Sequence, residues 1–236
     1  MILINLTKHI SASGFCSRRA AEDLIRSGQV TVDSKPAVLG QKVDPTRSKV
    51  MVSGHLIAGA EKMVYYLVNK PVGYTCTTKD SHVEHKVIDL VPKTPKVWPV
   101  GRLDKDSRGL IILTNDGDLT YQLTHPKFEH DKEYLATLSS VVTSDLLLRL
   151  KRGVRLEEGI TKADSAKKIS AVKLSIVIHQ GWNRQIRRML GACGYRVVDL
   201  ERVRIGKIKL GELREGEYKN VSPQPVPSGD FPFMLK

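Results

Sequence analysis

The sequence predicts an α+β protein in which a small N-terminal unit precedes a larger domain. Helical and strand-like segments are both present, and they do not alternate in the regular rhythm of a doubly wound parallel sheet. The chain is also long enough, because 236 residues with 41% hydrophobic side chains can form one large core and one small core. We place the two domains at residues 1–60 and 61–236.

The N-terminal unit is predicted to consist of two helices and a hairpin. The first helix lies in NLTKHISASG and ends at Gly14, and the second lies in SRRAAEDLIRSG, with Ser17 as its N-cap and Gly28 as its stop. Residues 29–43 alternate polar and β-branched side chains around a DSKP turn, which is typical of a hairpin. The side of the second helix opposite its apolar face carries three basic residues, Arg18, Arg19 and Arg26.

The larger domain mixes strands and helices, and its strand register stays open at this point. Strands are predicted at residues 63–71, 109–114, 132–138 and 171–180. Helices are predicted at residues 118–123 and 143–153 and from Asn183 onward. The tail PQPVPSGDFPF contains four prolines and is expected to run as an extended strap over the surface.

The charge balance favours a polyanionic partner. Lys and Arg number 38 against 25 Asp and Glu, which gives a formal charge of +13 and a pI near 9.7. Phosphate neutralisation and counterion release make nucleic acid the leading partner, ahead of an anionic membrane surface. No apolar run approaches the ~20 residues of a membrane span, and the start lacks the layout of a secretory signal. We therefore expect a cytoplasmic protein.

Cysteine and histidine spacing gives no support for a metal site. Cys16, Cys76 and Cys193 lie far apart, without a Cys-x-x-Cys spacing or a nearby histidine pair, so free thiols are expected. The stretch beginning at Asp104 (DKDSRG) resembles a calcium loop only in part. Position five is Arg108 instead of an oxygen ligand, the following GLIILT is strand-like, and a phosphate-binding glycine loop for a magnesium site is also missing.

The segment GRLDKDSRGLIILTNDG, residues 101–117, sets charged residues beside an apolar strand. Ionised groups tolerate burial only when they are paired or coordinated, so the cluster is either a solvated turn or a site. Asp104, flanked by Arg102, would stay ionised even when desolvated, because a nearby opposite charge favours its charged form. Such a carboxylate can act as a nucleophile or a base.

The segment NRQIRRMLGACG predicts a helix that displays arginines. Its N-cap is expected at Asn183, and Arg184, Arg187 and Arg188 then form one stripe opposite a second, apolar stripe of four residues. The apolar stripe consists of Ile186, Met189, Leu190 and Cys193. Residues 182–209 form the densest basic region, suited to phosphate or carboxylate. The alternative interpretation is a solvated face on which the arginines pair with surface acids.

Four motifs, in one order, resemble a known family. The family is that of the bacterial ribosomal RNA pseudouridine synthases that modify single uridines. The four stretches that resemble its motifs are VNKPVGYTCTT, VGRLDKDSRGLIILTNDGDL, KEYLAT and QGWNRQIRRMLGACGYRVVDLERVRIG. The N-terminal unit resembles the small S4-type RNA-binding module of this branch. The resemblance covers nearly the whole chain and is strongest to members that act on large-subunit RNA. It implies a mixed, mainly antiparallel central sheet flanked by helices.

The resemblance assigns roles to individual residues. Asp104 corresponds to the catalytic aspartate, Arg102 to the residue that holds the target flipped out or fills its place, and Tyr134 to the ring that stacks on the uracil. From the residues alone, Tyr134, Trp98 and Trp182 fit packing at least as well. Arg187 is implied to pair with Asp104, with Arg184 as the alternative partner. Asp106 is interpreted as scaffold, and Cys76 stands where the family has a serine.

The predicted function is the site-specific isomerisation of uridine to pseudouridine in 23S ribosomal RNA, without a metal or cofactor. The substrate is expected to be structured ribosomal RNA with a flipped-out uridine, bound by a monomer. The predicted RNA-binding residues are Lys8, Arg18, Arg19, Arg26, Lys70, Arg184 and Arg188. Two alternatives stay open: a non-catalytic RNA-binding ribosome assembly factor, and a uridine of 16S ribosomal RNA or tRNA as the substrate.

Overall fold

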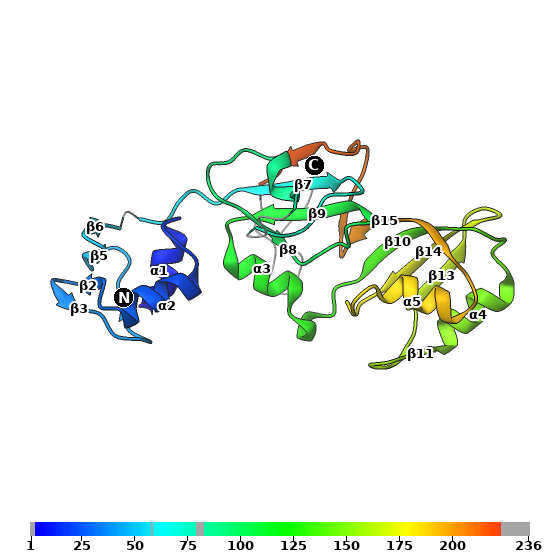
Figure 1. Cartoon of the computed structure of the whole chain (residues 1–236), viewed down its shortest axis with the longest axis horizontal. Helices are drawn as coiled ribbons and strands as arrows, with labels where there is room; N and C mark the ends of the chain where they lie inside the picture. Colours follow the sequence, from blue (N-terminus) through cyan, green and yellow to red (C-terminus); the bar gives the residue numbers. More distant parts are fainter. Residues whose placement is uncertain (1–2, 58, 79–82, 223–236) are drawn as a thin grey trace. The chain divides into compact units, whose positions relative to one another are not determined.

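The computed structural model describes residues 3–57, 59–78 and 83–222, so the proline-containing tail lies outside the described residues. The chain divides into two compact units (Figure 1). The N-terminal unit comprises Met1–Met63 with Thr94–Lys96, and the larger unit comprises Val64–Lys93 and Val97–Lys236. No helix in these described parts of the chain is long and apolar enough to cross a membrane.

The N-terminal unit contains the two predicted helices and the predicted hairpin. Ser17 caps the second helix, because its hydroxyl accepts a hydrogen bond from the Ala20 amide at 3.2 Å. Asp33 and Ser34 form the hairpin turn with φ values of 50° and 66°. The strands β3, β2, β5 and β6 make a four-stranded sheet in that order, and β1 pairs with β4. The elements are β1 (Ile4–Asn5), α1 (Leu6–Ala12), α2 (Arg18–Arg26), β2 (Val30–Val32), β3 (Lys35–Pro36), β4 (Lys42–Val43), β5 (Val50–Val52) and β6 (His55–Leu56).

The larger unit is organised around a nine-stranded sheet. Its main path runs β13-β14-β10-β15-β9-β7-β17, with β16 paired to β15 and β8 paired to β9. Only the β9/β15 pair in this sheet is parallel, which confirms a mixed, mainly antiparallel sheet. The elements are β7 (Tyr65–Lys70), β8 (Trp98–Val100), β9 (Arg108–Thr114), α3 (Gly117–Thr124), β10 (Lys132–Leu138), α4 (Ser144–Arg152), β11 (Val154–Leu156), β12 (Gly159–Thr161), β13 (Ser165–Lys168), β14 (Lys173–Ile178), α5 (Gln185–Ala192), β15 (Val197–Ile205), β16 (Ile208–Lys209) and β17 (Tyr218–Asn220), with two 3-10 turns at Val87–Leu90 and Pro126–Phe128.

Both faces of the sheet are covered, which explains the uninterrupted apolar run of β9. Ile111 and Leu113 pack into a core with α4 and α5, whereas Leu110 and Ile112 pack into a second core with α3. A strand with alternate residues in two cores needs apolar side chains at every position. Trp98 of β8 is half-buried beside β9 and donates its indole N–H to the Thr120 hydroxyl at 3.1 Å.

Strand β15 occupies the centre of this sheet, between β9 and β10, although it was not predicted. The sequence suggested only a basic surface region here. Four of its nine residues are charged, and neighbouring strands provide the partners of three: Asp199 and Glu201 bind Arg108, and Arg204 binds Glu133. Paired in this way, charged residues are tolerated at the centre of a sheet.

Candidate active site

A cavity of about 680 Å³ opens in the larger unit where the loop before β9, the strands β10 and β15 and the loop before α5 meet. It brings together three of the four residues assigned to the chemistry: Arg102, Asp104 and Tyr134. Arg187 does not line it. Asp104 also lines a second cavity of about 730 Å³, formed with residues 72–77. Both cavities are bordered by the loop 101–107, so Asp104 is the carboxylate that the two spaces share.

Asp104 is presented by a loop whose neighbouring residues are anchored. Leu103 is buried, and its amide donates a hydrogen bond to the Cys76 thiol sulfur at 3.3 Å. The buried Ser107 closes the turn, since its amide donates to the Asp104 carbonyl at 3.1 Å. The Asp104 side chain keeps 30% of its surface exposed. The loop therefore fixes the backbone of Asp104 while leaving its carboxylate open to a ligand.

The arginine beside Asp104 is Arg184, not Arg187, which corrects the predicted pairing. The Arg184 Nη1 atom lies 3.9 Å from the Asp104 Oδ2 atom, and this arginine binds Asp106 bidentately at 2.7 and 2.8 Å. Arg187 approaches Asp106 instead, with its Nε atom 3.4 Å from the carboxylate and its Nη2 atom 2.7 Å from the Asp106 carbonyl oxygen. The hydrogen bond from Arg184, with the charge of Arg187, lowers the pKa of Asp106 below its usual value. Asp106 thus holds both arginines.

The start of α5 also differs from the prediction. The helix begins at Gln185, and Arg184 precedes it in a left-handed conformation with φ of 48°, so Asn183 is not the N-cap. The buried Gln185 side chain accepts a hydrogen bond from the Trp182 amide at 3.1 Å and donates to the Thr161 hydroxyl at 2.7 Å. A side chain inside the helix therefore organises the loop before it. This geometry turns Arg184 toward the cavity.

The rest of α5 confirms the apolar stripe but not a free row of guanidinium groups. Ile186, Met189, Leu190 and Cys193 are buried in the core. On the other side, Arg188 binds Glu158 bidentately at 2.6 and 2.8 Å. Arg184 and Arg187 both pair with Asp106, so all three arginines of the predicted stripe pair with acids. The alternative interpretation of this face is therefore the one that the structure supports.

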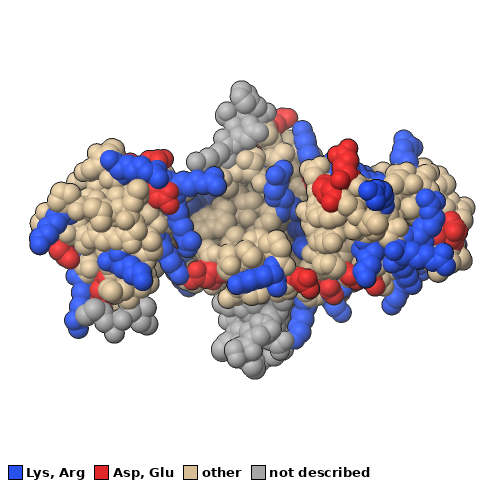
Figure 2. Space-filling view, turned by 90° about the horizontal axis from the view of Figure 1, so that it is seen from below, with Lys and Arg blue, Asp and Glu red and all other residues tan. Residues whose placement is uncertain are grey.

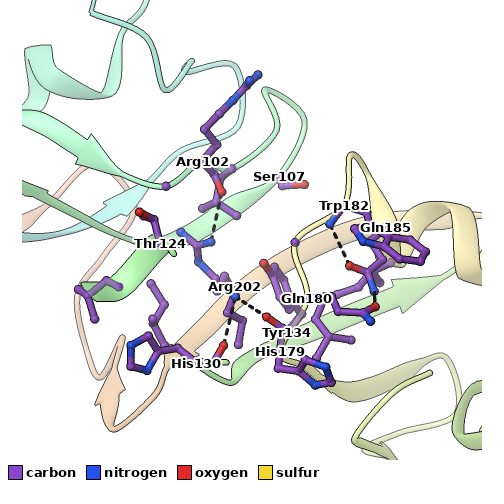
Figure 3. Close-up of a pocket in the computed structure, with 18 of the residues that line it drawn as sticks. Arg102, Ser107, Thr124, His130, Tyr134, His179, Gln180, Trp182, Gln185 and Arg202 are labelled. Atoms are coloured by element: carbon purple, nitrogen blue, oxygen red, sulfur yellow. Dashed lines mark hydrogen bonds between the residues drawn. The ribbon is translucent and has the colours of Figure 1, made fainter. Parts of the chain in front are cut away.

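Tyr134 lies on β10 directly beside Arg202 of β15. The two residues are register partners, because a bulge shifts the pairing between Glu133 and Tyr134 and leaves Val203 opposite no residue. Both side chains are at least nine-tenths buried and line the cavity (Figure 3). The Arg102 side chain, in contrast, is exposed and points away from the Tyr134 ring.

Two basic residues that sequence reasoning did not assign to the site also line the cavity. Arg202 is 3% exposed and donates to the Leu110 carbonyl at 2.8 Å and to the Arg102 carbonyl at 3.2 Å. The Lys132 ammonium donates to the carbonyls of His130 and His179 at 3.1 and 2.8 Å. Burial, reinforced by the charge of Arg202, lowers the pKa of Lys132 to about 8. In LERVRI, Leu200 and Arg202 are two residues apart, which is the spacing of side chains on one face of a strand. This spacing was the signal that could have placed Arg202 in a strand.

Lys70 was predicted to bind RNA, and this prediction is wrong. It ends β7, whose six residues are all buried, and its side chain is fully buried. Its ammonium donates to the carbonyls of Pro71 and Tyr74 at 2.9 and 2.8 Å. Burial lowers its pKa to about 8. Lys70 therefore braces the chain that leads to Cys76 and cannot reach a phosphate.

Apart from Arg184 and Arg188 at α5, the other predicted RNA-binding residues lie in the N-terminal unit. Arg18, Arg19 and Arg26 of α2 are exposed, and Arg26 pairs with Asp23 at 3.1 Å. Lys8 is half-buried on α1. Figure 2 shows Lys and Arg side chains on both units, with acidic side chains among them. Among the residues that the structure describes, no three His, Cys, Asp or Glu side chains gather as metal ligands would.

The chain is similar to known proteins over most of its length. Residues 64–192 match the family model described as RNA pseudouridylate synthase, and residues 6–47 match the S4 domain. The dual-specificity RNA pseudouridine synthase RluF of Escherichia coli K12 is 40% identical over 221 residues, which cover 93% of this chain and 76% of that protein. The ribosomal large subunit pseudouridine synthase B of Bacillus subtilis is 39% identical over 229 residues, or 94% and 93%. A solved structure described as a pseudouridylate synthase matches with a TM-score of 0.67 and 28% identity, over 93% of this chain and 96% of that one.

Proposed function

Because the chain belongs to the RNA pseudouridine synthase family, we propose that it isomerises a uridine of 23S ribosomal RNA with Asp104 as its catalytic residue. The family makes it an RNA isomerase that carries an S4 RNA-binding domain. A non-catalytic assembly factor, the rival interpretation of the sequence, is set aside on that ground. The single observation that carries the role of Asp104 is its position in the cavity with Tyr134 and Arg102.

The reaction needs one carboxylate and a pocket that holds a free base. The bond between N1 of uracil and C1′ of ribose breaks, and a bond between C5 and C1′ forms; C5 loses a proton and N1 gains one. No electron is gained or lost, and water is not consumed. Asp104 supplies the nucleophile or base for these steps, and the half-exposed guanidinium of Arg184 lies 3.9 Å from its carboxylate.

The surrounding side chains fit the remaining requirements of the reaction. A uridine must leave its stack, and the energy of unstacking is recovered by contacts in the pocket. Tyr134 offers an aromatic ring for the extruded uracil. We assign to Arg102, an exposed residue that lines the cavity, the role of holding the target out or filling its former position. Arg187 does not line the cavity. It holds the loop of Asp104 by donating a hydrogen bond to the Asp106 carbonyl oxygen.

The choice of 23S ribosomal RNA rests on similarity. The GRLDKDS and LERVRI motifs resemble members that act on large-subunit RNA, and the B. subtilis relative is named for the large ribosomal subunit. The E. coli relative is described as dual-specificity, without a named RNA, and 16S ribosomal RNA and tRNA are kept as the competing substrates. Action on ribosomal RNA places the protein in the cytoplasm, where we expect it to work as a monomer.

Mapping pseudouridines in cells with and without the protein tests this proposal. We expect a single 23S position to lose its modification when the protein is absent and to regain it with the wild-type gene. The variant Asp104→Asn should restore nothing, while the purified variant binds the RNA within about tenfold of the wild type, because phosphate contacts supply most of the affinity. Turnover by Asp104→Asn would refute the catalytic role. Loss of the modification from 16S ribosomal RNA or tRNA alone would refute the substrate.

A further inference from the structure

Arg202 is fixed in the cavity with one hydrogen-bonding group unused. Its Nε and Nη1 atoms donate to backbone carbonyls, whereas its Nη2 atom is buried and meets no acceptor among the residues that the structure describes. A buried donor without a partner costs about 1–3 kcal/mol. The proposed function gives Arg202 no role. A ligand that accepts a hydrogen bond from the Nη2 atom would remove this cost.

The strand geometry places this atom where the edge of the uracil should lie. The bulge at Val203 makes Arg202 the register partner of Tyr134, so the two side chains leave the same face of the sheet (Figure 3). A base that stacks on the Tyr134 ring presents its carbonyl oxygens at its rim. The donor beside the ring is then within reach of that rim.

The position of Arg202 in the sheet is enforced from its other side. Gly109 of β9 is the parallel register partner of Arg202, and a Cβ atom at position 109 would lie 2.6 Å from the Arg202 amide nitrogen. Gly109 also has a φ of +107°, which L side chains rarely adopt. The backbone of Arg202 therefore approaches β9 as closely as glycine allows, and the guanidinium bridges β9 to the loop of Asp104.

Charge also favours an electron-rich ligand at this point. Lys132 and Arg202 are two cations that line one cavity, and their mutual repulsion contributes to the lowered pKa of Lys132. A carbonyl oxygen relieves that repulsion without bringing a full charge into a buried site. A phosphate, in contrast, suits the exposed Arg102, which also lines the cavity.

We propose that Arg202 donates a hydrogen bond from its Nη2 atom to a carbonyl oxygen of the flipped-out uracil. This inference rests on the proposed function, because it requires a uracil on Tyr134. At O4, the bond would select uracil over cytosine, which carries an amino group there; at O2, it would orient the base without that selection. In either case Arg202 is a substrate-binding residue, and it also holds the backbone beside Asp104.

The test measures binding alone, in the Asp104→Asn background, so that catalysis does not enter. The probe is a short RNA that carries the mapped uridine, prepared with uridine, 4-thiouridine or 2-thiouridine at that position. Sulfur is a poor hydrogen-bond acceptor. We expect one of the two thio substitutions to weaken binding by about 10-fold, the loss of a hydrogen bond to a charged donor. With Arg202→Lys added, the same substitution should change the affinity less than about 2-fold.

Two controls separate this inference from a structural effect. Arg204→Lys, on the same strand but paired with Glu133, should retain the full thio effect. If Arg202→Lys does not fold, the RNA arm still decides, because equal binding of all three RNAs by Asp104→Asn would overturn the inference without a variant at position 202. An equal thio effect with and without Arg202→Lys would also overturn it. The result is independent of whether the mapped uridine lies in 23S ribosomal RNA.

Discussion

The basic residues of the two units differ in their surroundings, although both units carry many of them. In the N-terminal unit, Arg18 and Arg19 stand on the exposed side of α2. In the larger unit, Arg187 and Arg202 are committed to carbonyls and carboxylates around the cavity, and Lys70 is fully buried. An exposed guanidinium can neutralise a phosphate, whereas a buried one positions other groups. Net charge alone therefore does not say which basic residues bind RNA.

This difference separates two measurable quantities. Loss of exposed cations should weaken RNA binding and its dependence on salt, because each phosphate contact releases counterions. Loss of the paired or buried cations should affect stability or turnover and leave the salt dependence unchanged. The comparison fails if loss of an exposed cation leaves the salt dependence unchanged, or if loss of a paired or buried cation reduces it.

The largest effect is expected from burial of Lys70. Its pKa is about 8 in the folded protein against an ordinary value of 10.5, so between these two pH values the unfolded chain binds more protons. Stability then rises with pH across that window. Relative to Lys70→Met, the wild-type free energy of unfolding should increase by up to about 3 kcal/mol between pH 7 and pH 10.5, measured by urea denaturation.

Exposed Lys35 of β3 provides the matched control for this titration. Lys35→Met should leave the pH dependence of stability as it is in the wild type. If Lys70→Met shows the same profile as the wild type, Lys70 is not buried as described, and the contrast between the units is lost.

Asp106 tests the paired arginines. Without its carboxylate, Arg184 is free to close the 3.9 Å gap to Asp104 and neutralise it, and Arg187 loses its acidic partner. Asp106→Asn should therefore lower turnover at saturating RNA by about 30-fold, with the RNA affinity and its salt slope unchanged. Glu158→Gln removes the same charge from the pair with Arg188, which does not line the cavity, and should leave turnover unchanged. Weaker RNA binding by Asp106→Asn would contradict the distinction between paired arginines, which affect turnover, and exposed cations, which affect RNA binding.

The sequence revealed the strands whose residues are apolar, and it concealed the strand whose charges are paired. Strand β9 was evident because both of its faces lie in cores. Strand β15 was not, since the partners of Asp199, Glu201 and Arg204 lie 71 to 93 residues away in the chain. Periodicity detects burial, but it cannot detect a charge that is buried with a distant partner.

The candidate site shows the same limit at the level of single contacts. Motifs brought Asp104 and Tyr134 into one site, and both line the cavity. They could not decide which of Arg184 and Arg187 faces Asp104, because a second acid, Asp106, lies only two residues away and pairs with both arginines. The start of α5 was also misplaced: its N-cap is Arg184, in a left-handed conformation and without a side-chain cap bond, instead of Asn183.

The exposed cations of α2 give the smallest expected effect. The double variant Arg18→Ala with Arg19→Ala should weaken RNA binding by about 10-fold at physiological salt and reduce the slope of log affinity against log salt by about 1.5, since each lost phosphate contact contributes about 0.7–0.9. Turnover at saturating RNA should stay at the wild-type value, opposite to Asp106→Asn. An unchanged salt slope would show that α2 does not bind the RNA backbone, and the basic surface of the N-terminal unit would then need another explanation.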